Sequence, residues 1–128
     1  MMDLPINQVA DLLSASLKWV DPDNIYTSFV TPDEDTTGKT TFIRVQDAVS
    51  QLDRYRNDDP AVINAGVEVQ VFFSTDGDVN IFQAKLEIIR LLQTNGWLVQ
   101  RPLTPDTTDP DTYQKTITIY ANKNLEIR

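Results

Sequence analysis

A strand followed at once by a helix and a second strand, within residues 67–101, constrains the fold more than any other feature of the sequence. Val67, Val69, Val71 and Phe73 alternate with Glu68, Gln70 and Phe72. This alternation predicts a strand over 67–73 with one buried face. The spacing of apolar residues predicts a helix over 80–95, with Asn80 as N-cap and Asn95-Gly96 as its end. Such a unit requires a sheet with a helix packed on its face.

The helix predicted over 80–95 is apolar around more than half of its circumference. Its apolar residues are Ile81, Phe82, Ala84, Leu86, Ile88, Ile89, Leu91 and Leu92. A helix that lies on a sheet with its back to water needs an apolar stripe of only about 100°. The excess predicts a second cover, supplied either by the first helix or by another subunit.

The rest of the chain divides into one more helix, four more strands and three long polar loops. The helix is predicted over 3–17, the strands over 25–30, 40–45, 97–101 and 115–121, and the loops over 31–39, 53–65 and 102–113. We expect 31–39 to join its two strands as a hairpin. Residues 46–52 are compatible with a helix or with a continuing strand, and this choice stays open.

The element order α-β-β-β-α-β-β predicts one α+β domain over residues 1–128. We expect a mixed β-sheet of about four to five strands with two helices packed on one face. At 128 residues the chain is long enough to build its own hydrophobic core.

Composition excludes several classes of function. The chain has no Cys and no His, which rules out disulfides, thiolate or imidazole metal sites, cysteine nucleophiles and Ser–His–Asp triads. Nineteen acidic residues against eleven basic ones give a net charge of −8, which argues against broad electrostatic binding to nucleic acid or anionic membranes. No segment has the roughly 20 apolar residues of a membrane span. The N-terminus lacks the pattern of a secretory signal, so we expect a cytoplasmic protein.

Three acidic clusters are the remaining candidates for chemistry, at 33–35, 76–78 and 109–111. None has the spacing of a calcium-binding loop. Asp, Gly and Pro are also ordinary turn-forming residues, which explains all three clusters without a metal. We therefore predict no enzyme activity, no catalytic residues, no cofactor and no metal site. A carboxylate-dependent hydrolase with a divalent ion is a much weaker hypothesis.

The C-terminal half resembles a small family from tailed phages and prophages of Gram-positive bacteria. The similar features are Gly96-Trp97, a strand, a polar loop, and Asp109-Pro110-Asp111-Thr112-x-Gln114 before an alternating strand. The run 68–73 and the helix after it also fit, so the resemblance covers about 66–121. Family members have about this length, are encoded among tail genes and are catalogued as a domain of unknown function. They often carry His-Thr before the Asp-Pro-Asp-Thr element, whereas this chain has no His.

This resemblance implies a tail terminator, also called a tail-completion protein. Such proteins are small α+β subunits that close into a ring, usually a hexamer, on the assembled tail tube. The ring halts tube polymerisation and forms the surface for head–tail joining, so its partners are the tail tube protein and a head-completion protein. DNA passes through the hole without sequence-specific binding. The implied locations are the bacterial host cytoplasm during assembly and the head-proximal end of the virion tail.

For such a ring we predict a subunit interface on the sheet edge and the second helix. Its apolar residues are Phe72, Phe82, Leu86 and Ile89, and its rim charges are Glu87 and Arg90. The alternative hypothesis is an acidic monomeric adaptor that binds a basic virion or host protein without forming a ring.

Overall fold

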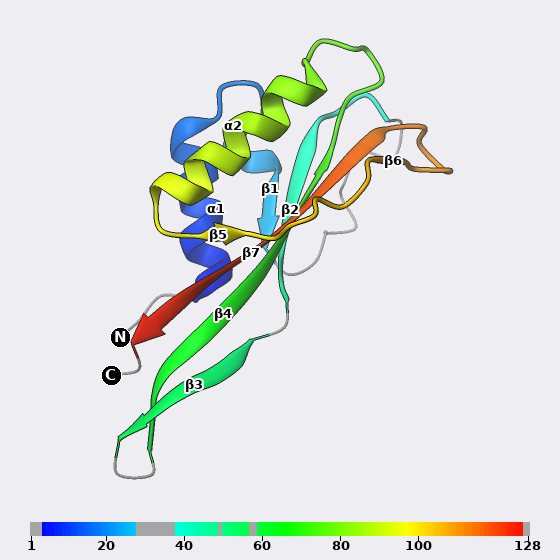
Figure 1. The fold of residues 1–128 in the computed structure, drawn as a ribbon. Helices are drawn as coiled ribbons and strands as arrows, with labels where there is room; N and C mark the ends of the chain where they lie inside the picture. Colours follow the sequence, from blue (N-terminus) through cyan, green and yellow to red (C-terminus); the bar gives the residue numbers. More distant parts are fainter. Residues whose placement is uncertain (1–3, 28–37, 49, 57–58, 127–128) are drawn as a thin grey trace.

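The computed structural model describes residues 4–27, 38–48, 50–56 and 59–126, and it is an α+β fold (Figure 1). The elements in chain order are α1 (Pro5–Ser16), the 3₁₀ helix η1 (Pro22–Asn24), β1 (Ile25–Thr27), β2 (Phe42–Asp47), β3 (Gln51–Arg56), β4 (Asp59–Phe72), α2 (Ile81–Thr94), β5 (Leu98–Val99), β6 (Thr107–Thr108) and β7 (Lys115–Glu126). The predicted class, with two helices and a mixed sheet, is confirmed.

One mixed sheet contains all the strands of the described residues. Its main path is β1-β2-β4-β7-β5, with β3 beside β4 and β6 beside β7. β1 and β2 are parallel, and the other pairs are antiparallel. Because β4 and β5 are both antiparallel to β7, they run parallel to each other and α2 connects them, as the sequence predicts. β3 and the first half of β4 extend beyond the helices (Figure 1).

The sheet has seven strands among the described residues, more than the four to five predicted. The loop predicted over 53–65 is wrong, because β3 and the first half of β4 lie there. β4 pairs with β3 on one side and with the end of β7 on the other. β3 is the adjacent strand in sequence and β7 is a distant one, and together they satisfy the backbone of a segment whose own sequence is weakly strand-forming. β6 likewise lies in the loop predicted over 102–113.

The segment left open at 46–52 is strand at both ends, since β2 runs to Asp47 and β3 begins at Gln51. The predicted hairpin between the first two strands is wrong. β1 and β2 pair in parallel, with Ile25 opposite Ile43. A parallel pair requires a return crossover between its strands. Residues 28–37, which include most of this predicted loop and its acidic cluster, lie outside the described residues.

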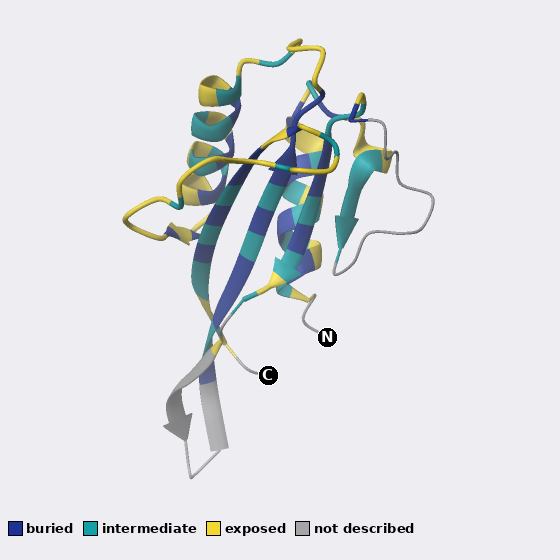
Figure 2. Cartoon of the chain, turned by 90° about the vertical axis from the view of Figure 1, so that its right-hand side faces the viewer, coloured by how far each residue is buried: buried dark blue, intermediate teal, exposed yellow. Residues whose placement is uncertain are grey.

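Both helices pack on one face of the sheet and build the core there. α1 buries Ile6, Val9 and Leu13 at spacings of three and four, and α2 buries Ala84, Ile88 and Leu92. They pack on the odd-numbered residues of the two central strands, which include Val67, Val69, Val71, Ile117 and Ile119. The opposite face of the sheet carries no helix (Figure 2).

Both ends of α2 are fixed by the predicted residues. The Gln83 N–H donates to Asn80 Oδ1 at 3.1 Å, which confirms Asn80 as N-cap. At the other end the Gly96 N–H donates to the Gln93 carbonyl and the Trp97 N–H to the Leu92 carbonyl. These two hydrogen bonds require a residue with a left-handed backbone conformation after the helix, and Gly96 has φ +89°. The turn directs Trp97 into the core.

The segment 109–114 is an ordered turn that holds the start of β7 against the entry to β2. Asp109 Oδ1 accepts from the N–H groups of Asp111, at 2.8 Å, and Thr112. The Gln114 side chain is 1% exposed, and its Nε2 donates to the Thr40 carbonyl at 2.8 Å. Gly38 has φ +83° and lies directly against the turn: an added Cβ would be 2.5 Å from the Thr112 carbonyl oxygen. The element that carries the family resemblance therefore has a structural role.

We predict that Gly38→Ala lowers the free energy of unfolding by more than Gly77→Ala does. Gly77 also has a positive φ, +70°, but an added Cβ there meets no atom within 4 Å. In both variants the alanine must adopt a left-handed backbone conformation, which costs about 1–2 kcal/mol. Only Gly38→Ala adds a clash with backbone, which raises its cost by at least about 1 kcal/mol. Urea unfolding of both variants measures the difference, and equal losses would contradict the close approach of the turn.

Candidate functional site

An exposed apolar strip runs along one flank of α2. Phe82, Leu86 and Ile89 stand at positions i, i+4 and i+7, which places them on one side of the helix. We call these three residues the α2 strip. Phe82 is 69% exposed, while Leu86 and Ile89 are half-buried. Arg90 is exposed one turn after Leu86, at the border of the strip. Contiguous apolar side chains left at a surface mark a protein contact.

Glu87 lies on the other flank of α2, which α1 covers. Trp19 Nε1, just after α1, donates to Glu87 Oε1 at 2.8 Å. The Trp19 ring lies against Phe73, with 5.7 Å between ring centroids. The first helix therefore covers part of the wide apolar surface of α2, which is one of the two kinds of cover that the sequence predicts. In the α2 strip, Ile89 packs partly against the core, whereas Phe82 is exposed.

Phe72 does not lie with the α2 strip. Side chains alternate along β4, so Val71 and Phe73 enter the core while Phe72 points to the helix-free face. There it stacks on Phe42, with centroids 4.5 Å apart and an interplanar angle of 10°, and Arg44 lies over its ring. Phe72 is 8% exposed. Of the predicted interface residues, the structure brings together Phe82, Leu86, Ile89 and Arg90, and it separates Phe72 and Glu87 from them.

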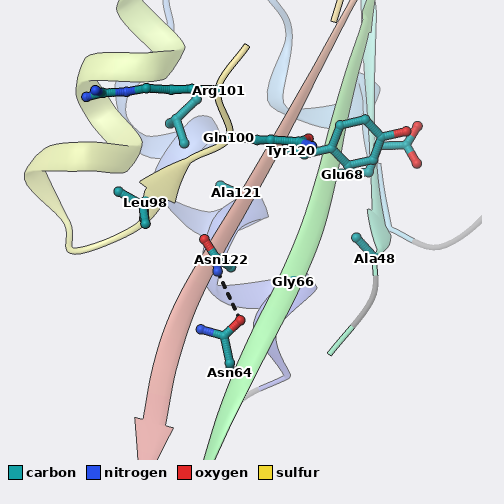
Figure 3. A pocket seen from close by; sticks show the side chains of 11 residues that line it. Ala48, Asn64, Gly66, Glu68, Leu98, Gln100, Arg101, Tyr120, Ala121 and Asn122 are labelled. Atoms are coloured by element: carbon teal, nitrogen blue, oxygen red, sulfur yellow. Dashed lines mark hydrogen bonds between the residues drawn. The ribbon is translucent and has the colours of Figure 1, made fainter. Parts of the chain in front are cut away.

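A pocket of about 840 Å³ lies on the helix-free face, where β4, β7 and β5 adjoin (Figure 3). Two hydrogen bonds order the amides at one end of it. Asn122 Nδ2 donates to Asn64 Oδ1 at 2.9 Å, and Asn64 Nδ2 donates to Asn124 Oδ1 at 2.8 Å. Leu98 on β5 forms an apolar wall and is 63% exposed. The pocket thus offers both apolar and polar surface.

Glu68 forms part of this pocket and is half-buried without a partner. Its cross-strand neighbours are Gln46 and Tyr120, both uncharged. Arg44, two residues before Gln46 on β2, donates instead to Gln70 Oε1 at 2.6 Å. The Glu68 carboxylate makes no hydrogen bond or ion pair with any part of the chain that the structure describes. In Figure 3 it lies beside the Tyr120 ring, and Arg101 points away from it.

The sequence did not reveal the pocket. Its residues come from three strands, from the residues after β5 and from Ala48 after β2, and only the pairing register brings them together. The available signal was the set of polar residues that alternate with the core residues in β4 and β7. That signal marks a solvated face but gives no position across the strands.

The acidic clusters that the structure describes are engaged in turns and surface pairs. Asp76 forms an ion pair with Lys39 at 3.2 Å, and the Asp109 carboxylate accepts from the Asp111 N–H within its own turn. Lys85 on α2 binds Asp106 at 2.7 Å. Over the described ranges, no three acidic side chains gather in a way that would hold a metal ion. The helices described there are too short and too polar to cross a membrane.

The chain matches a known protein family. The family model DUF806, described as a protein of unknown function, matches residues 3–126. The match covers nearly the whole chain, well beyond the segment 66–121 on which the sequence resemblance rests. No curated protein matches the chain.

The sequence predicts that Phe72 and Phe82 both lie in one interface. We predict that alanine substitution lowers the free energy of unfolding much more at Phe72 than at Phe82. Phe72→Ala removes a buried, stacked ring and lowers the free energy of unfolding by about 3 kcal/mol. Phe82→Ala changes it by no more than about 0.5 kcal/mol, because that ring is exposed. Thermal or urea unfolding at low protein concentration measures both. A large loss for Phe82→Ala would show that Phe82 belongs to the core.

Proposed function

Because the chain belongs to the DUF806 family, which matches it almost from end to end, we propose that it is a structural phage protein. We assign it the role of a tail terminator, which caps the tail tube as a ring, halts tube polymerisation and forms the head–tail joining surface. This role follows the resemblance of 66–121 to phage tail proteins. Its sites of action are the host cytoplasm during assembly and the head-proximal end of the virion tail.

The α2 strip is the observation that carries the proposal. α1 covers the other flank of α2, and the sheet covers its base. The strip begins at Ile89, which packs partly against the core, and ends at Phe82, which folding leaves exposed. A subunit of a closed ring contacts two neighbours through two different patches. The helix-free face supplies a second patch, because its pocket lies across the sheet from the helices.

The charge of the chain is compatible with a conduit for DNA. Basic side chains that contact phosphates hold nucleic acid, and their affinity rises with each contact. A net charge of −8 at pH 7 opposes such contacts. In the proposed ring, DNA therefore slides through the hole without being retained.

The acidic adaptor remains the second candidate function. The unpaired Glu68 carboxylate and the net charge of −8 favour a basic protein partner. An adaptor of this kind stays monomeric by itself, whereas a ring subunit self-associates through the α2 strip. Self-association therefore distinguishes the two functions.

We predict that Phe82→Glu abolishes self-association and leaves the chain folded. A carboxylate in the strip must be desolvated when the strip is covered, whereas in the free subunit it stays in water. The matched control is Gln83→Glu, which places the same charge one residue away on the exposed polar side of α2. Both substitutions lie in the first turn, so the helix dipole affects them alike.

Sedimentation velocity and thermal unfolding together measure this outcome. We expect Phe82→Glu to be a monomer that unfolds cooperatively at the melting temperature of the dissociated wild-type chain, because association itself raises the melting temperature. We expect wild-type association for Gln83→Glu. Unchanged association of Phe82→Glu would contradict the assignment of the α2 strip as the interface.

A further inference from the structure

Two unpartnered features of the chain are complementary in chemistry. The α2 strip is apolar with the Arg90 cation at its border. The pocket has an apolar wall and the unpartnered Glu68 carboxylate, and its other charged residue, Arg101, points away from that carboxylate (Figure 3). We propose that they are the two halves of one head-to-tail contact, in which the α2 strip of one copy docks in the pocket of the next copy. Arg90 of the first copy then pairs with Glu68 of the second. This inference rests on the proposed ring and identifies the surfaces that form it.

The cations of the described residues point to Arg90 as the partner of Glu68. Among the cations whose side chains the structure describes, a set that does not include Arg54 and Arg56, five already have a partner within the chain: Lys39 binds Asp76, Arg44 binds Gln70, Lys85 binds Asp106, Lys115 binds Thr108 and Lys123 binds the Asn95 carbonyl. Lys18, Arg90 and Arg101 make none of these contacts. Arg101 belongs to the pocket itself, and Lys18 follows the buried Leu17 at the end of α1. Arg90 is the one that adjoins an exposed apolar strip.

A half-buried carboxylate gains most from such a partner. Ion pairs between fully exposed side chains contribute little, because water screens them. Docking of the α2 strip would exclude water from the pocket, so an unpaired Glu68 would then be costly and a paired one favourable. The same pair fixes which way the strip enters the pocket.

The dimensions of the two surfaces agree. Glu68 on β4 is opposite Tyr120 of β7, and Leu98 on β5 is opposite Asn122, so the two are separated by two strand spacings across the sheet and two residues along it, about 12 Å in all. Along the axis of α2, Leu86 lies about 6 Å from Arg90 and Phe82 about 12 Å from it. With Arg90 at Glu68, the strip therefore extends to the exposed Leu98. The contact would bury the two most exposed apolar groups of these surfaces, Phe82 and Leu98.

A second copy is the occupant that fits, because one chain carries both halves on different sides of its sheet. An isologous dimer would require each patch to face itself, strip against strip and pocket against pocket. A head-to-tail contact uses each half once per copy and repeats around a ring. A different protein partner would leave one of the two halves uncovered.

Charge exchange tests the pairing. We expect Arg90→Glu and Glu68→Arg each to weaken self-association at least about tenfold. Both changes in one chain restore it, because every contact of the ring then has a reversed but complementary pair. A one-to-one mixture of the two single variants restores it as well, because the strip of each variant then meets a pocket of opposite charge on the other variant and the two alternate around the ring. Light scattering reads the mass in each case.

Matched controls change the same charges elsewhere. Lys18→Glu and Asp78→Arg alter exposed positions outside both surfaces and should leave association unchanged. A cysteine pair gives an independent readout, because the natural chain has no Cys. Phe82→Cys with Leu98→Cys should form disulfides between copies and give a ladder of oligomers on a non-reducing gel. Within one copy the two positions are separated by most of α2, roughly 18 Å, which is too far for a disulfide.

The outcomes separate this inference from the proposed function. If the wild-type chain forms a ring that neither charge variant weakens, or if the cysteine pair gives no ladder, the docking of strip in pocket is wrong and the ring stands. If the wild-type chain is monomeric at every concentration, the proposed ring fails and this contact fails with it. Loss in both single variants with rescue in the double variant supports both.

Discussion

The pairing of β4 with β7 is the constraint on which the rest of the structure depends. Their register runs without a break from Val62 opposite Glu126 to Phe72 opposite Thr116. Because side chains alternate along a strand, this single register assigns one set of residues to the helices and the other to the helix-free face. A shift by one residue would expose Val69 and bury Glu68. The core, the aromatic stack at Phe72 and the pocket are therefore consequences of the same backbone hydrogen bonds.

Local signals in the sequence identify the elements whose stability is local. The apolar spacing and the caps at Asn80 and Gly96 locate α2 to within one residue, and alternation over 67–73 locates the buried half of β4. Sequence alone does not identify strands that depend on distant partners. The first half of β4 pairs with the end of β7, about 60 residues later in the chain, as Val62 opposite Glu126 shows. β1 is parallel to β2 for a related reason, since its partner is set by packing under α1 and not by a turn.

The same distinction explains what sequence shows of the candidate site. The excess apolar width of α2 is visible in the spacing of Phe82, Leu86 and Ile89. The spacing does not show that Glu87 lies on the flank toward α1, because that depends on its hydrogen bond with Trp19. Phe72 is apolar and precedes α2 closely, yet strand alternation places it across the sheet. The pocket needs the register of three strands at once. Helical periodicity thus predicts one surface of a proposed contact, and sheet register supplies the other.

In the proposed ring, neighbouring copies cover both of these surfaces. The most direct measurement is the absolute mass of the wild-type chain by light scattering over a wide range of concentrations, with negative-stain images of the same peak. The account predicts closed rings with a central hole and a mass near that of about six subunits, as expected for a cyclic terminator. A monomer at every concentration, or an open filament, would contradict it.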